Sequence, residues 1–124
     1  FSASGAVWIE PQQMLATVGD EGSVALVSIQ GNITVTLSFS IEEHQLPALD
    51  FEGISVGPAV SNTEDLTIVY VMIEFPAVIL EIEIPSGVVL RRFELELVEG
   101  KKKRGIEALT FIPETDSTGY FYAG

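Results

Sequence analysis

The chain has 124 residues, 47% of them hydrophobic, and a formal charge of −12 with six Lys and Arg residues. This length suits one domain, and many apolar residues together with high charge fit a folded protein with an acidic surface rather than a disordered segment. So few basic residues exclude nucleic acid as a partner, because phosphate binding needs a basic surface. The sequence contains no cysteine, which excludes disulfides and thiolate metal sites.

Two further features of the composition concern partners. No apolar run reaches the ~18 residues of a membrane span, since Glu74 and Pro76 interrupt the segment 66–80 that comes nearest. Four of the six basic residues are consecutive: Lys101, Lys102, Lys103 and Arg104. Such a run favours a solvated loop between two strands. The alternative is an interaction patch for an acidic surface, for example on another copy of the chain.

Strand patterns follow one another along the chain, and no window has a sustained helical period. Pro47 restricts residues 41–49 to a loop with at most one helical turn. Residues 66–73 are almost wholly apolar, which predicts a strand covered on both faces. In residues 78–84 the aliphatic side chains are expected to face inward, and Glu81 and Glu83 outward. The predicted strands are 6–9, 14–18, 23–29, 33–39, 51–56, 66–73, 78–84, 88–97, 106–112 and 119–123.

The chain repeats itself. The stretch Asp50-Phe51-Glu52-Gly53-Ile54-Ser55-Val56-Gly57-Pro58 has a counterpart in Gly105-Ile106-Glu107-Ala108-Leu109-Thr110-Phe111-Ile112-Pro113, about 55 residues later. Glu52 aligns with Glu107, and Asp20 aligns with Glu74 at nearly the same offset. Four strands in each repeat, joined by tight hairpins, are typical of a β-propeller blade.

The repeat predicts an all-β, β-propeller-like fold over residues 1–124 as a single domain. Four-stranded antiparallel blades of about 55 residues are expected at residues 5–41 and 50–97, and a third blade begins at residues 105–124. A ring takes about 4 to 8 blades. Two and a half blades therefore predict that other copies, or the remainder of a longer chain, complete the ring. The alternative is that the blades stack into an open, filament-like array.

The same residues carry a family resemblance. Asp50-Phe51-Glu52-Gly53-Ile54 with Pro58, and the stretch from Gly105 to Thr110, resemble blade starts in the SdiA-regulated and esterase-like-phytase group of propellers. Glu74 at the end of an inner strand, followed by Pro76, also resembles that group. The resemblance implies a propeller with carboxylates near its central channel, often associated with calcium. It also implies an extracellular or periplasmic location. It does not imply one activity.

Four carboxylates, Asp20, Glu52, Glu74 and Glu107, fall at the ends of predicted inner strands. Clustered carboxylates repel one another, and a hard cation such as Ca²⁺ with oxygen ligands would relieve the repulsion. We therefore predict a calcium site at these residues. The alternative is structural, with each carboxylate accepting backbone N–H bonds from an adjacent turn.

Other candidate residues are scattered. Asn32-Ile33-Thr34 is an acceptor sequence for N-glycosylation at Asn32, on an expected hairpin tip. His44, the single histidine, lies in a polar loop and is expected to face solvent. Four aromatic residues could line a sugar-binding surface or pack between blades; they are Trp8, Tyr70, Tyr120 and Tyr122.

The sequence favours a propeller-type binding or structural scaffold over an enzyme, because it offers no Gly-x-Ser-x-Gly elbow and no nucleophile with an oriented base. The alternative is a calcium-dependent hydrolase of the phytase or esterase type, in which channel carboxylates hold the metal and activate water. The scarcity of basic residues argues against phosphate chemistry. A third interpretation, a glycan-binding module, needs exposed aromatic residues.

Overall fold

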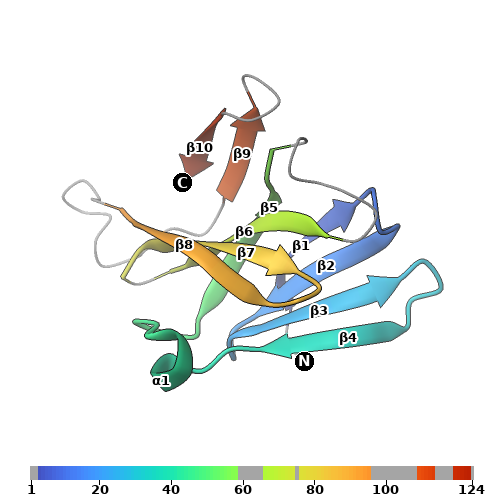
Figure 1. The fold of residues 1–124 in the computed structure, drawn as a ribbon, viewed down its shortest axis with the longest axis horizontal. Coiled ribbons are helices and arrows are strands. Elements are labelled where there is room, and N and C mark those ends of the chain that lie inside the picture. The colour runs from blue at the N-terminus through green and yellow to red at the C-terminus, as the bar shows by residue number, and fades with distance from the viewer. Residues whose placement is uncertain (1–2, 59–65, 75, 96–108, 114–118, 124) are drawn as a thin grey trace.

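A computed structural model describes residues 3–58, 66–74, 76–95, 109–113 and 119–123. Ten strands and one helical turn, α1 (Ile41–His44), make up the described regular structure. They form two four-stranded sheets and one two-stranded sheet, and all neighbouring strands are antiparallel and consecutive in the chain (Figure 1). The first sheet contains β1 (Ala3–Ile9), β2 (Met14–Gly19), β3 (Ser23–Ser28) and β4 (Ile33–Ser38). The second contains β5 (Phe51–Val56), β6 (Thr67–Ile73), β7 (Val78–Ile84) and β8 (Val88–Glu94), and the third contains β9 (Leu109–Pro113) and β10 (Gly119–Ala123).

The turn between β2 and β3 shows how the connections are fixed. Gly22 has a φ of +74°, a conformation that favours glycine. A Cβ atom at this position would also lie 2.7 Å from the side chain of Leu49. The carbonyl of Gly22 accepts a hydrogen bond from the Phe39 N–H at 2.9 Å. The end of β4 and the loop after α1 are therefore both held against this turn.

The first and second sheets share one hydrophobic core. Val18 and Val24 contribute to it from the first sheet, and Val71, Leu80 and Ile82 from the second. Each of these aliphatic side chains is at most 4% exposed, and so is that of the neighbouring Leu26. Burial of such side chains stabilises a fold by roughly 1.5–3 kcal/mol each. Packing of the first sheet against the second is thus the main tertiary contact of the described residues.

A second core lies on the opposite face of the second sheet. Tyr70, Met72 and Ile79 point into it, and Phe111 of β9 and Phe121 of β10 pack against them. Successive residues of β6 therefore enter alternate cores, as the period of a strand requires. All seven residues of β6 are buried, which confirms the prediction of a strand covered on both faces.

The all-β prediction is confirmed, as is the limit of one helical turn at residues 41–49. No sheet in the described part of the chain closes on itself. The outer strand predicted at residues 88–97 is β8, which ends at Glu94; residues 96 and 97 lie outside the described residues. With a single turn, α1 is much too short to cross a bilayer, and the described chain contains no longer helix.

Candidate functional site

Acidic side chains gather where the first two sheets meet. Asp20 follows β2, Asp50 precedes β5 and Glu52 is the second residue of β5. The backbones of β1 and β5 approach closely here, since a Cβ atom at Gly5 would lie 3.3 Å from the carbonyl oxygen of Glu52. Because β2 pairs with β1, this approach brings the end of β2 to the start of β5.

Three of these groups form an acidic cluster, Asp20, Asp50 and Glu52. One carboxylate oxygen from each lies within 4.8 Å of the others. Asp20 is exposed, whereas Asp50 and Glu52 are half-buried. The hydroxyl of Ser4 donates a hydrogen bond to Asp20 Oδ1, and the N–H of Glu74 donates one to the carbonyl of Asp50 at 3.2 Å.

The structure thus brings together two of the four residues predicted to bind metal, Asp20 and Glu52. Glu74 is near enough to act electrostatically on Glu52, and Glu107 lies outside the described residues. Asp50 was missed by the repeat alignment. The spacing i, i+2 to Glu52 could have found it, because alternate residues near a strand point to the same side.

The cluster raises the pKa of Glu52 to about 7. Burial of the carboxyl group is the largest cause, followed by a hydrogen bond to Asp50 and by the negative charges of Asp50, Glu74 and Asp20. All of these effects disfavour the ionised carboxylate. Near neutral pH the cluster therefore holds a proton that an isolated glutamate would have lost.

This shifted pKa predicts how stability depends on pH. The folded state binds the Glu52 proton more tightly than the unfolded state, whose pKa lies near 4.5. The contribution of Glu52 to stability is therefore greatest at low pH and falls as the pH rises from about 4.5 to about 7. We expect Glu52→Gln to remove this decline and to raise the melting temperature at pH 8. Thermal unfolding between pH 4.5 and 8 measures it.

The matched control is Glu42→Gln, which removes an exposed carboxylate from the first turn of α1. It should leave the pH dependence of the melting temperature as in wild type. A Glu52→Gln protein that loses stability over this pH range as steeply as wild type would contradict the assignment of the proton to the cluster.

The donor set of the cluster fits a hard divalent cation. Ca²⁺ prefers oxygen ligands, such as those of carboxylates. It binds roughly 6–8 oxygen atoms in flexible geometry, and water supplies some of them. Three carboxylates within reach of one point could supply up to about six oxygens if each bound through both atoms. A cation there would also offset the repulsion that raises the pKa of Glu52.

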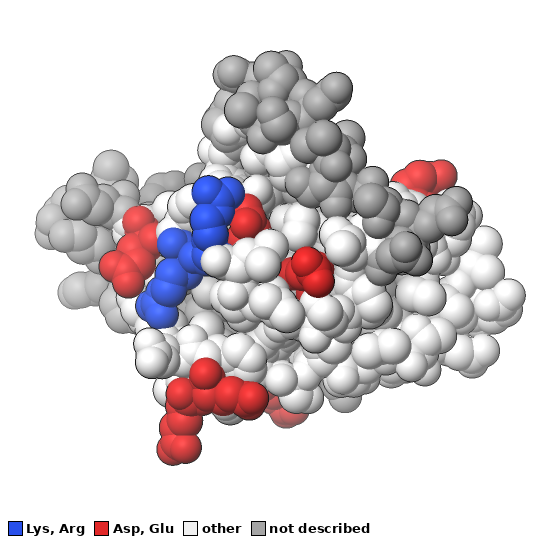
Figure 2. All heavy atoms as spheres, in the orientation of Figure 1, with Lys and Arg blue, Asp and Glu red and all other residues white. Residues whose placement is uncertain are grey.

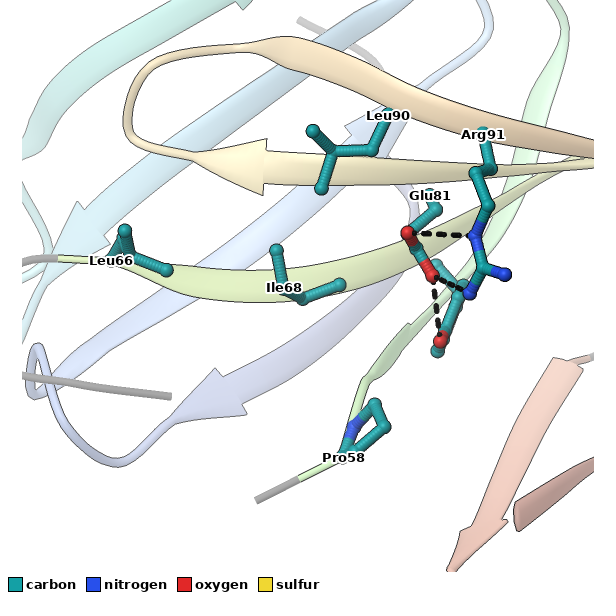
Figure 3. Close-up of a pocket in the computed structure, with 7 residues that line it drawn as sticks. Pro58, Leu66, Ile68, Glu81, Leu90 and Arg91 are labelled. Atoms are coloured by element: carbon teal, nitrogen blue, oxygen red, sulfur yellow. Dashed lines mark hydrogen bonds and ion pairs between the residues drawn. The ribbon is translucent and has the colours of Figure 1, made fainter. Parts of the chain in front are cut away.

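A second polar arrangement crosses the second sheet on the face of the second core. Tyr70, Glu81 and Arg91 are directly paired across β6, β7 and β8. The Tyr70 hydroxyl donates a hydrogen bond to Glu81 Oε2 at 3.0 Å. The Arg91 guanidinium donates from Nε to Oε1 at 3.1 Å and from Nη2 to Oε2 at 2.8 Å (Figure 3). The prediction that Glu81 faces outward is therefore wrong, because its cross-strand partners allow the carboxylate to be buried.

These three side chains border a depression of about 290 Å³ that is otherwise lined by Pro58, Leu66, Ile68 and Leu90. Hydrogen bonds from Arg91 lower the pKa of Glu81, while burial and Glu81 raise the pKa of Tyr70 to about 12. Neither group exchanges a proton near neutral pH, so neither suits general acid–base catalysis. The three residues instead join the outer strand β8 to the middle of the sheet.

The remaining candidates that the structure describes do not converge. Asn32 is exposed beside the β3–β4 turn, as expected of the sequon. The His44 ring lies 5.1 Å from the ring of Phe39. Trp8 is 40% exposed and Tyr70 is buried, so they do not form one aromatic surface. The run Lys101, Lys102, Lys103 and Arg104 lies outside the described residues, as do the side chains of Tyr120 and Tyr122.

Figure 2 shows the two described arginines as one blue strip with red carboxylates beside it. Arg91 is bonded to Glu81, and Arg92 donates to the carbonyl of Gln45 at 2.6 Å and lies 3.4 Å from a Glu94 oxygen. Both guanidinium groups are thus engaged away from the acidic cluster.

No protein-family model matches the chain, and no curated protein is similar to it in sequence.

Proposed function

We propose that the chain is a propeller-type module with a binding or structural role, in which sheets stack face to face as blades of a larger ring or assembly. The observation that carries this proposal is the burial of the second sheet on both faces, by the first sheet on one side and by β9 and β10 on the other. A sheet in a two-layer sandwich would have one face in water. A blade that lies between two other blades has neither face in water.

The positions of β1, β5 and β9, the first strands of the three sheets, support the same arrangement. The β1 backbone approaches β5 at Gly5 and Glu52, and the Phe111 N–H of β9 donates to Ser55 Oγ of β5 at 2.9 Å. The first strand of each sheet is therefore next to the first strand of the following sheet. This is the relation expected of inner strands around a common axis, with β4 and β8 at the rim.

Several copies of the chain, or the remainder of a longer chain, would complete the ring, and an extracellular or periplasmic location belongs to this proposal. The mass of the purified chain in solution, measured by light scattering, tests the self-assembling form. The proposal expects a mass several times the 13.4 kDa of one chain. A purified chain that is a monomer at every concentration, with its second core formed, would contradict self-assembly through sheet faces.

The acidic cluster favours calcium as a second part of the proposal, in a structural role. Calcium chloride should raise the melting temperature of the wild-type protein, because the ion binds the folded cluster and not the unfolded chain. Asp50→Asn removes one charged ligand and should abolish most of this increase, whereas Glu42→Gln should retain it. Equal increases in all three proteins would show that the ion acts elsewhere.

The hydrolase alternative receives less support than the structural role. Phosphate hydrolysis at this cluster would need cationic groups to hold the substrate. The described arginines, Arg91 and Arg92, bind Glu81 of β7, the carbonyl of Gln45 just after α1, and Glu94 of β8 instead.

A further inference from the structure

The outer strand of the first sheet differs from that of the second. β4 pairs only with β3 among the described strands and is a sheet edge. Five of its six residues are exposed, and its sequence, Ile33-Thr34-Val35-Thr36-Leu37-Ser38, contains no charge and no proline. β8 occupies the corresponding edge of the second sheet and contains Arg91, Arg92 and Glu94. Charges on an edge prevent strand addition, so β8 is protected and β4 is not.

The sequence on both sides of β4 shares this lack of charge. No Asp, Glu, Lys, Arg or His occurs between Glu21 and Glu42, although the chain as a whole has a charge of −12. This is the longest uncharged run in the sequence. Figure 2 shows the surface over the β3–β4 hairpin as white spheres. Exposed aliphatic side chains gather here as well, with Ile29 72%, Ile33 58% and Val35 36% exposed.

From these observations we infer that β4 is a self-association edge, and that its partner is β4 of a second copy of the chain. Two copies that each have a charge of −12 repel one another at their acidic surfaces. The uncharged hairpin is where they can approach at least electrostatic cost. A strand that pairs antiparallel with its own copy also forms a closed twofold contact.

The sequence of β4 is self-complementary in that pairing. Ile33, Val35 and Leu37 alternate with Thr34, Thr36 and Ser38, and opposite residues of an antiparallel pair lie on the same face. With Val35 opposite Val35 of the second copy, Ile33 lies opposite Leu37. The aliphatic row then continues across both copies. A shift of one residue would place aliphatic side chains against hydroxyls.

This contact uses the edge of the first sheet, whereas the proposed ring uses sheet faces. The inference therefore does not depend on the proposed function. In a ring, an edge at the rim would join two rings without altering either.

Val35→Lys tests the inference, because the two introduced ammonium groups would lie opposite each other at the twofold axis and repel. Sedimentation velocity should show that self-association weakens by about tenfold or more. At protein concentrations near the wild-type dissociation constant, the average mass should fall towards half the wild-type value. Val88→Lys is the matched control, since Val88 is a 51% exposed residue of β8. It should keep the wild-type mass. Circular dichroism establishes that each variant is folded.

A single thiol gives an independent readout, because the chain contains no cysteine. Directly opposite Cα atoms are about 4.5–5.5 Å apart, within the range that a disulfide spans. Val35→Cys should oxidise to a disulfide-linked dimer much faster than Val88→Cys. This variant also answers the question if Val35→Lys fails to fold.

Each outcome decides between the two proposals. A large particle whose mass Val35→Lys leaves unchanged, with equal cross-linking at both thiols, would overturn edge pairing and leave the ring intact. A simple dimer that Val35→Lys converts to monomer would support edge pairing and contradict assembly through sheet faces. A wild-type monomer that cross-links equally at both positions would overturn edge pairing and the self-assembling form of the ring.

Discussion

Ile82→Asp is expected to prevent the chain from folding. Ile82 is fully buried in the core between the first and second sheets. The substitution removes an aliphatic side chain, which costs about 2–5 kcal/mol, and places an ionisable group in an apolar core. Together these losses are comparable to the whole stability of a small domain, about 5–15 kcal/mol. Far-UV circular dichroism and thermal unfolding should show no cooperative transition.

Leu90→Asp is the control for this prediction. Leu90 lies on the neighbouring strand β8 and is 45% exposed, so the same new charge meets water there. This variant should unfold with a melting temperature close to wild type. If Ile82→Asp also unfolds as wild type does, residue 82 cannot face the first sheet, and the register of β7 described above is incorrect.

Tyr70→Ala is expected to cost about 3–5 kcal/mol in the free energy of unfolding, as for other buried aromatic residues. The Tyr70 ring stacks on Phe111 of β9 with centroids 5.2 Å apart and meets Phe121 of β10 edge to face at 4.6 Å. Its removal takes away the ring contacts that Phe111 and Phe121 of the third sheet make with Tyr70 of the second sheet. Urea denaturation measures the loss.

Tyr70→Phe separates packing from hydrogen bonding at the same position. It keeps the ring and removes the hydroxyl that donates to the Glu81 carboxylate, at a cost of roughly 1.5–3 kcal/mol because the acceptor is charged. Glu81 keeps its two bonds from Arg91. If Tyr70→Ala is no more damaging than Tyr70→Phe, the third sheet does not pack on Tyr70 and the second core is absent in solution.

The sequence predicts the strands well because their side-chain period is local. The alternation in residues 78–84 places Val78, Leu80, Ile82 and Ile84 in the first core, as found. The same alternation was misleading for Glu81. Whether a carboxylate on the other face is buried depends on what the neighbouring strands place opposite it, here Tyr70 and Arg91. That register follows from two hairpins and is not visible in the period of one strand.

The acidic cluster could likewise be predicted only in part. The repeat identified Asp20 and Glu52 because each occupies a defined position within a predicted blade. Their meeting depends on the close approach of β1 and β5 at Gly5, which is a contact between sheets. Sequence periodicity describes the inside of a sheet, so it could not supply this contact or the part played by Asp50 in it.

We propose that the sheets stack as blades with their first strands innermost. Imaging of the native particle by electron cryomicroscopy tests this arrangement most directly. We expect a particle in which β1, β5 and β9 lie nearest a common axis and β4 and β8 lie at the rim. A two-layer sandwich, with the second sheet open to solvent on the face of Tyr70 and Met72, would contradict it.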